Sequence, residues 1–147
     1  MKKLGFLFIA AIFIMGNCSR KNIKVIESSF DNGQPKVVTF YDKFNGEKKK
    51  TKQITYYQNG QKKMEGTFEK GKRHGQWTSY YKNGTVWSEV IYKEGKANGI
   101  KKTFYKNGDL YYKGQLKNGK RIGKWVFYDT KGGKTVIDYD KRNEFDN

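Results

Sequence analysis

Hydrophobic and polar residues alternate in short segments along the middle of the chain. Within residues 63–69, Met64, Gly66 and Phe68 occupy one set of positions, and charged or polar residues stand between them. Such a period of two residues is typical of a β-strand with one buried face. Glycine-containing segments separate one such run from the next, so the pattern predicts consecutive antiparallel strands.

Glycines divide the chain at a regular interval of 24 residues. Asn-Gly pairs recur at 59–60, 83–84 and 107–108, and Gly132 falls on the same interval. A repeat of this length predicts an all-β, elongated antiparallel β-hairpin array in which each unit contacts only its neighbours. The residues that define this repeat are Gly60, Gly66, Gly71, Gly75, Trp77, Gly84, Gly95, Gly99, Gly108, Gly114, Gly119, Gly123 and Trp125.

Each repeat is expected to contain two different reversals. Asn-Gly is the strongest signal for a two-residue hairpin turn, because both central residues must adopt positive φ. The second glycine pair brackets a basic segment, Gly71 to Gly75 in the first repeat, and predicts a longer loop. We therefore expect tight turns at the Asn-Gly pairs and wider loops at the other edge.

A hairpin centred between residues 71 and 72 pairs a glycine with a tryptophan. This register places Gly66 opposite Trp77, where the missing side chain leaves room for an indole ring. The same operation gives the pairs Val90–Lys101 and Gly114–Trp125.

Extending the register predicts two different faces. The core face would gather Tyr57, Met64, Phe68, Trp77, Tyr81, Val86, Val90, Tyr92, Tyr105, Leu110, Tyr112, Leu116, Trp125 and Phe127. The other face would carry charges and a candidate aromatic binding row formed by Tyr56, Tyr80, Trp87, Phe104, Tyr111 and Tyr128. Tyr80 with Trp87, and Phe104 with Tyr111, would form cross-strand aromatic pairs. This row either closes the hairpins or binds sugars, bases or a partner strand.

The N-terminus has the pattern of an export signal. Residues 1–17 combine a basic start, a short apolar run and small residues, which predicts a signal peptide; the alternative is an uncleaved membrane anchor. Cys18, the only cysteine, follows directly. Its position resembles the lipobox of bacterial lipoproteins, which implies lipidation at Cys18 and a place on the bacterial cell envelope, outside the cytoplasm.

The remaining regions follow from this reading. Residues 18–29 would be a lipid-anchored linker, and residues 30–52 a degenerate first repeat that begins with Phe30-Asp31-Asn32-Gly33. Residues 53–137 would hold the regular repeats, and the polar residues 138–147 a tail or a cap.

Positive charge dominates the composition. The formal net charge is +17 and falls to +15 when residues 1–17, with Lys2 and Lys3, are removed. A polyanion is therefore a reasonable partner, although lysines at the edge of a sheet also prevent aggregation. The candidate polyanion edge consists of Lys70, Lys72, Arg73, Lys93, Lys96, Lys117, Lys120 and Arg121.

The repeat resembles the MORN repeat in its bacterial variant form. The resemblance covers about residues 53 to 133 and is carried by Tyr-Tyr-x-Asn-Gly followed by Gly-Lys-x-x-Gly-x-Trp, as in residues 71–77 and 119–125; the middle repeat has Lys101 in place of the tryptophan. It implies an elongated hairpin array that acts as a binding or scaffolding module, with anionic lipid and proteins proposed as ligands. Bacterial variants are often labelled antitoxin-like, which implies a toxin partner.

The sequence contains no recognisable catalytic or metal-binding set. His74 is the only histidine, and its equivalents in the other repeats are Asn98 and Ile122. Glu65 and Glu89 share a repeat position, which would suit a pair of glycosidase carboxylates, but balancing neighbouring lysines is the simpler role. We therefore expect no enzyme, no cofactor and no metal.

The expected function is that of an exported, non-catalytic lipoprotein whose repeat surface binds a protein or an anionic envelope component. The alternative is an antitoxin or immunity protein that neutralises a cognate toxin. Export disfavours nucleic acid as a partner, and the oligomeric state stays open.

Overall fold

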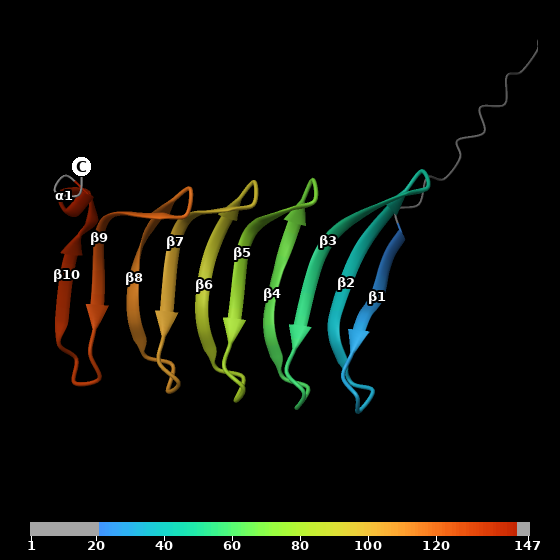
Figure 1. The fold of residues 1–147 in the computed structure, drawn as a ribbon, viewed down its shortest axis with the longest axis horizontal. Helices are drawn as coiled ribbons and strands as arrows, with labels where there is room; N and C mark the ends of the chain where they lie inside the picture. The colour runs from blue at the N-terminus through green and yellow to red at the C-terminus, as the bar shows by residue number, and fades with distance from the viewer. Residues whose placement is uncertain (1–20, 144–147) are drawn as a thin grey trace, which may run out of the picture.

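The computed structural model describes residues 21–143, which form one open antiparallel sheet and a short helix (Figure 1). Ten strands lie side by side in sequence order, and each pairs with the next. They are β1 (Lys21–Ser29), β2 (Pro35–Phe44), β3 (Glu47–Tyr56), β4 (Lys62–Glu69), β5 (Lys72–Tyr80), β6 (Val86–Lys93), β7 (Lys96–Phe104), β8 (Leu110–Lys117), β9 (Lys120–Tyr128) and β10 (Lys134–Asp138), followed by helix α1 (Tyr139–Asn143). The predicted all-β hairpin array is confirmed.

The sheet begins earlier than expected. Residues 21–29, which we placed in a linker, form β1 and pair with β2 through contacts such as Val25 opposite Thr39. The linker prediction is wrong here because Ile23 and Val25 continue the alternation of a strand. Residues 1–17, Cys18 and residues 144–147 lie outside the described residues.

The turns after β2, β4, β6 and β8 are tight, against our expectation. In the β4–β5 hairpin, Glu69 pairs directly with Lys72, so only Lys70 and Gly71 form the turn. Both have positive φ, 49° and 76°. These are the angles of a two-residue turn whose twist matches the flanking strands. The basic segment from Gly71 to Gly75 is therefore mostly strand.

The Asn-Gly loops are the longer ones. The Gly60 amide donates to the Tyr57 carbonyl at 2.9 Å, and the Tyr57 amide donates to the Gln61 carbonyl at 2.8 Å. Gly60 has positive φ but Asn59 does not, because the Asn59 Oδ1 accepts a hydrogen bond from the Gln61 amide at 3.2 Å instead. A three-residue loop ending in a left-handed glycine results. The loop at Phe30–Gln34 has the same backbone hydrogen bonds, which supports a degenerate first repeat.

The predicted pairing of glycine with tryptophan survives this exchange of turns. Moving away from the tight turn, Thr67 pairs with His74, and the ladder then shifts by two residues so that Gly66 pairs with Trp77. The shift leaves Gly75 and Gln76 out of this ladder and restores the expected register. Val90 likewise pairs with Lys101.

Buried side chains gather along the sheet itself. Trp77 is 3% exposed and Trp125 is fully buried at 0%. The Trp77 ring covers Gly66, and the guanidinium of Arg73 lies 4.1 Å above the ring centroid. On the opposite face, Val38 and Ile54 pair across β2 and β3 and are also buried. A single sheet thus hides its large apolar groups by stacking neighbours over one another.

Hydrogen bonds between repeats link both edges. The hydroxyls of Tyr57, Tyr81 and Tyr105 donate to the main-chain carbonyls of the residues 23 positions on, at 2.8, 2.9 and 2.8 Å. We call this series the tyrosine ladder. At the tight-turn edge, the Gly95 amide donates to the Arg73 carbonyl at 2.9 Å. Each repeat therefore fixes the position of the next.

Helix α1 caps the C-terminal end of the sheet. Tyr139 packs edge-on against Trp125, with ring centroids 5.8 Å apart. Asp140 Oδ1 accepts a hydrogen bond from the Gly123 amide at 2.9 Å. Of the two alternatives for this region, the structure favours a cap for Tyr139–Asn143. Within residues 21–143, no helix has the length and apolar character needed to cross a membrane.

Candidate binding surfaces

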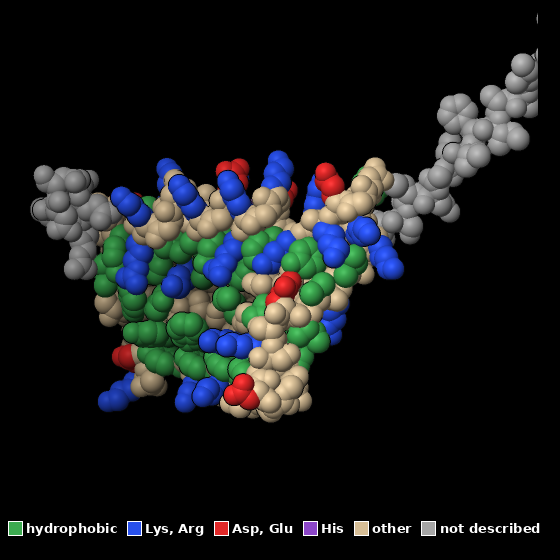
Figure 2. All heavy atoms as spheres, turned by 45° about the vertical axis from the view of Figure 1, so that its right-hand side comes forward, with side chains coloured by type: hydrophobic (Ala, Val, Ile, Leu, Met, Phe, Trp, Pro, Cys, Tyr) green, Lys and Arg blue, Asp and Glu red, His purple; other side chains and the backbone are tan. Residues whose placement is uncertain are grey.

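Exposed lysines line the tight-turn edge, which we call the basic edge. Figure 2 shows Lys and Arg side chains projecting along this upper edge, with a few acidic side chains between them. Lys93 pairs directly with Lys96, and Lys117 with Lys120. Among the described residues, none of these four lysines makes an ion pair. Like charges directly opposite one another destabilise a hairpin, so an anion bound here would relieve that repulsion.

Two arginines of the predicted edge point elsewhere. Arg73 stacks over Trp77 and also lies 5.4 Å from the Tyr92 ring centroid. Arg121 stacks over Trp125 at 4.6 Å and reaches the Tyr139 hydroxyl. Assigning them to the edge was wrong because a guanidinium binds favourably to an aromatic face beside it. Lys70, Lys72, Lys93, Lys96, Lys117 and Lys120 remain at the edge and are exposed.

The basic edge extends further toward the N-terminus than the sequence indicated. Lys43 pairs with Lys48 beside the Asn45-Gly46 turn. This hairpin lies in the degenerate first repeat, where the 24-residue interval is lost, so the sequence search did not reach it. The pairing of two lysines around an Asn-Gly turn was the available signal.

A cavity of about 360 Å³ opens beside these residues. Phe44, 48% exposed, and Phe68 contribute its apolar lining. The Lys50 ammonium also lines it and lies 4.0 Å from the Phe68 ring centroid. Burial lowers the pKa of Lys50, the nearby Glu27 carboxylate raises it and the Arg73 charge lowers it, with a net decrease.

Irregular pairing divides the predicted aromatic row. Tyr56, Tyr80, Phe104 and Tyr128 are the last residues of their strands. Trp87 is skipped between the pairs Ser79–Ser88 and Tyr80–Val86, and Tyr111 is skipped in the same way one repeat later. The single aromatic row is therefore wrong. A β-bulge redirects the side chain of the extra residue, and period-two counting does not register it.

The bulge residues pack on the tyrosine ladder. Trp87 contacts Tyr81, with ring centroids 6.4 Å apart, and Tyr111 contacts Tyr105 at 4.8 Å. These contacts replace the expected pairs of Trp87 with Tyr80 and of Tyr111 with Phe104. Lys63 occupies the same bulge position in the first regular repeat, and its ammonium lies 5.7 Å from the Tyr57 centroid.

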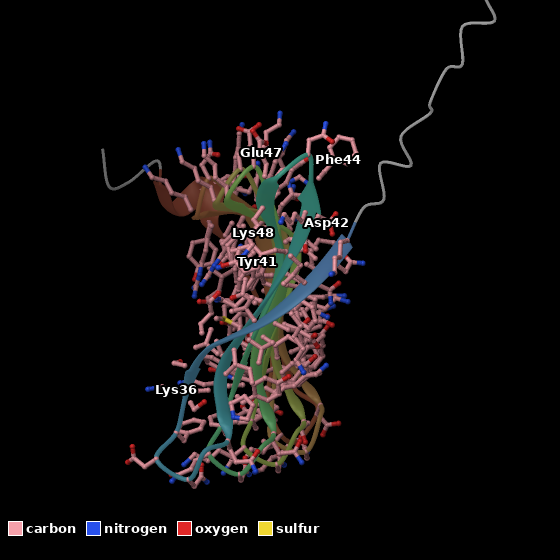
Figure 3. All side chains as sticks on the ribbon, turned by 90° about the vertical axis from the view of Figure 1, so that its right-hand side faces the viewer. Lys36, Tyr41, Asp42, Phe44, Glu47 and Lys48 are labelled. Atoms are coloured by element: carbon pink, nitrogen blue, oxygen red, sulfur yellow. The ribbon has the colours of Figure 1, made fainter. Side chains whose placement is uncertain are left out.

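An open pocket of about 330 Å³ lies beside the first bulge. We call it the loop-side pocket. Its floor is a row of directly paired residues on four neighbouring strands, from β2 to β5. The floor residues are Val37, Thr55, Met64 and Ser79, and the surrounding residues are Lys36, Tyr56, Tyr57, Lys63, Tyr80 and Trp87. In Figure 3, Lys36 lies at the lower end of the molecule, far from Phe44 and Glu47 at the basic edge.

Sequence reasoning found only part of this pocket. Tyr56, Tyr80 and Trp87 belong to the predicted aromatic row, whereas Lys36, Lys63 and Ser79 were not singled out. The common spacing of Lys63, Trp87 and Tyr111 was the signal for an equivalent bulge position. Their shared direction follows only from the observed pairing.

A charged cluster surrounds Glu65. Its carboxylate accepts hydrogen bonds from Lys52 at 2.8 Å, Lys62 at 2.9 Å and the Tyr80 hydroxyl at 2.7 Å. Burial alone would raise the pKa of Glu65, but these hydrogen bonds together lower it to about 2. Burial and the same carboxylate raise the pKa of Tyr80 to about 12. Glu65 is thus an anion near neutral pH and cannot donate a proton.

The other acidic candidate is similarly occupied. Glu89 Oε1 accepts a hydrogen bond from Gln76 at 3.0 Å, and Glu89 Oε2 lies 3.9 Å from the Lys102 ammonium. His74 Nδ1 lies 3.0 Å from Glu69 Oε2. Residues 21–143 contain no group of three or more His, Cys, Asp or Glu side chains placed to hold a metal ion.

The fold and these surfaces define an open β-hairpin repeat protein. Three of its segments, residues 51–70, 73–94 and 97–118, match the MORN repeat variant. The chain therefore carries three MORN repeat variants, which correspond to the hairpins β3–β4, β5–β6 and β7–β8. The predicted 24-residue organisation agrees with this match.

Other comparisons add little about function. A comparison with curated proteins finds no match. One similar solved structure is a crystal structure of an S. aureus TarM mutant in complex with Fondaparinux, alpha-GlcNAc-glycerol and UDP. The similarity covers 69% of this chain and 21% of that chain, at 16% identity and a TM-score of 0.36. A likeness this weak carries no functional argument.

Proposed function

We propose that this protein is a non-catalytic binding module whose basic edge holds an anionic component of the bacterial cell envelope. The carrying observation is the pair of directly opposed lysines, Lys93–Lys96, repeated as Lys117–Lys120. Two strands separate equivalent residues, so the pairs are about 10 Å apart. Regular spacing of this kind suits a ligand with several negative charges, such as a phospholipid surface or an anionic polymer.

The proposed location follows from the N-terminal sequence. Residues 1–17 would direct export, and lipidation of Cys18 would hold the repeat sheet at a membrane. A single lipid-modified residue gains membrane affinity when a basic surface lies nearby, because acyl chains and positive charge act together. The sequence and the basic edge thus support the same location.

Vesicle binding tests the basic edge. Full-length protein would be mixed with phosphatidylglycerol vesicles and, separately, with neutral phosphatidylcholine vesicles, over a range of salt concentrations. A variant with Lys93, Lys96, Lys117 and Lys120 changed to Gln should lose most of the preference for anionic vesicles. The control changes Lys82, Lys106, Lys131 and Lys134, which are exposed lysines away from that edge, to Gln. Equal losses in the two variants would contradict an edge-specific site.

Fractionation of the native host tests export and lipidation. Intact-mass analysis should find a lipid on Cys18 in the membrane fraction, and the Cys18→Ala variant should be uncleaved or released. A cytoplasmic protein that still begins at Met1 would contradict the lipoprotein proposal. That outcome would favour the alternative function, an antitoxin or immunity protein, and direct the search to a cognate toxin.

A further inference from the structure

We propose that the loop-side pocket binds a sugar ring that carries an acidic group, such as a uronic acid unit. This site goes beyond the proposed function because it lies on different residues from the basic edge. The volume of about 330 Å³ is at the small end of the range of about 300–1,000 Å³ for small-molecule sites. A single ring with its substituents is therefore a suitable occupant.

The pocket offers an aromatic surface that is not yet covered. The Trp87 side chain is 49% exposed although it belongs to a β-bulge in the interior of the sheet. Its contact with Tyr81 is loose, with a centroid separation of 6.4 Å and an interplanar angle of 56°. Indole rings have a large apolar face, and the C–H face of a pyranose ring can lie against it.

The floor alternates between apolar and hydroxyl side chains. Val37, Thr55, Met64 and Ser79 succeed one another across four strands in direct register. Apolar lining with a few placed polar groups is the usual composition of a ligand site. In this pocket, Thr55 and Ser79 can exchange hydrogen bonds with the hydroxyls of a sugar, while Val37 and Met64 contact its carbon atoms.

Two lysines give the pocket its charge preference. Lys36 and Lys63 both line it, and their ammonium groups lie 5.8 and 5.7 Å from the ring centroids of Phe30 and Tyr57. Neither forms an ion pair with a described residue, and no carboxylate is among the lining residues. An acidic substituent on the sugar would complete this arrangement, whereas a cationic ligand would be repelled.

The next repeat supplies a matched control. Tyr111 stands 24 residues after Trp87 and is likewise a bulge residue, 40% exposed. Its ring packs more closely than that of Trp87, against Tyr105 at 4.8 Å and Tyr112 at 5.1 Å. Tyr111→Ala therefore removes an exposed aromatic residue from the same structural position without altering the loop-side pocket.

Ligand-observed NMR with full-length protein tests the proposal, with glucuronic acid and glucose as probes. Glucuronic acid should bind saturably and shift the indole Nε1–H resonance of Trp87. Trp87→Ala should weaken binding by at least about tenfold, as expected when a stacking ring is removed, while Tyr111→Ala should bind like the wild type. Lys36→Gln and Lys63→Gln should each weaken glucuronic acid binding about two- to fivefold and leave glucose binding unchanged.

Several results would overturn this site. They are no saturable binding of either sugar, equal losses in Trp87→Ala and Tyr111→Ala, or equal affinity for glucose and glucuronic acid. The variant with glutamines at Lys93, Lys96, Lys117 and Lys120 should bind glucuronic acid normally. This last measurement separates failure of the loop-side pocket from failure of the basic edge.

Discussion

Trp77 lies directly over Gly66, and a side-chain carbon added at Gly66 would overlap the indole ring. Trp125 covers Gly114 in the same way, 48 residues later. Gly66→Ala should therefore destabilise the protein by about 1–3 kcal/mol, the usual cost of overpacking a buried site. Urea unfolding followed by circular dichroism measures this loss.

The middle repeat suggests the compensating change for that substitution. There Val90 pairs with Lys101, so a larger residue faces a flexible one. Gly66→Val combined with Trp77→Lys copies this pair, and its destabilisation should be smaller than the sum of the two single effects. Simple additivity would mean that the two positions do not compete for the same space.

The tyrosine ladder can be tested by removing a single oxygen atom. Tyr81→Phe deletes the 2.9 Å hydrogen bond to the Phe104 carbonyl and should cost about 0.5–1.5 kcal/mol. Tyr111→Phe serves as the control, because the Tyr111 hydroxyl makes no hydrogen bond with a described residue. Equal unfolding midpoints for Tyr81→Phe and the wild type would show that the ladder does not stabilise the array.

Glu65 should make stability depend on acid pH. Its pKa is about 2 in the folded protein and 4.5 as a model value, so the carboxylate stabilises the folded state above about pH 4.5. This contribution should decline as the pH falls from about 4.5 toward 2. Glu65→Gln should be less stable than the wild type at neutral pH, and the difference should shrink over that interval. Unfolding curves of both proteins across the interval provide the test, and a constant difference would contradict the ion cluster.

The C-terminal cap should act locally. Tyr139 packs on Trp125 as Tyr92 packs on Trp77, with centroid separations of 5.8 and 6.0 Å. Helix α1 thus replaces the strand that a further repeat would supply. Tyr139→Ala should accelerate amide hydrogen exchange in β9 and β10 and leave β4 and β5 little changed, since repeat arrays transmit stability between neighbours. Uniform acceleration throughout the sheet would show that the whole array unfolds as one unit.

The sequence by itself determined the repeat and much of its register. Gly66 and Trp77 identify each other because only a residue without a side chain leaves room for an indole across the strand. The alternation around Met64 and Phe68 assigns faces correctly, since period-two patterns depend on local backbone geometry alone. These relations hold within one hairpin and are therefore legible in the chain.

Tertiary structure decided the turns, the bulges and the surfaces. The Asn59 side chain captures an amide of its own loop, so a strong two-residue turn signal yields a three-residue loop. Arg73 leaves the basic edge because Trp77 lies within its reach. The loop-side pocket combines residues from β2 to β6 with Tyr57, and Trp87 joins it only through an irregularity in strand pairing. Each outcome depends on competition between contacts from different strands, which no single segment of the sequence contains.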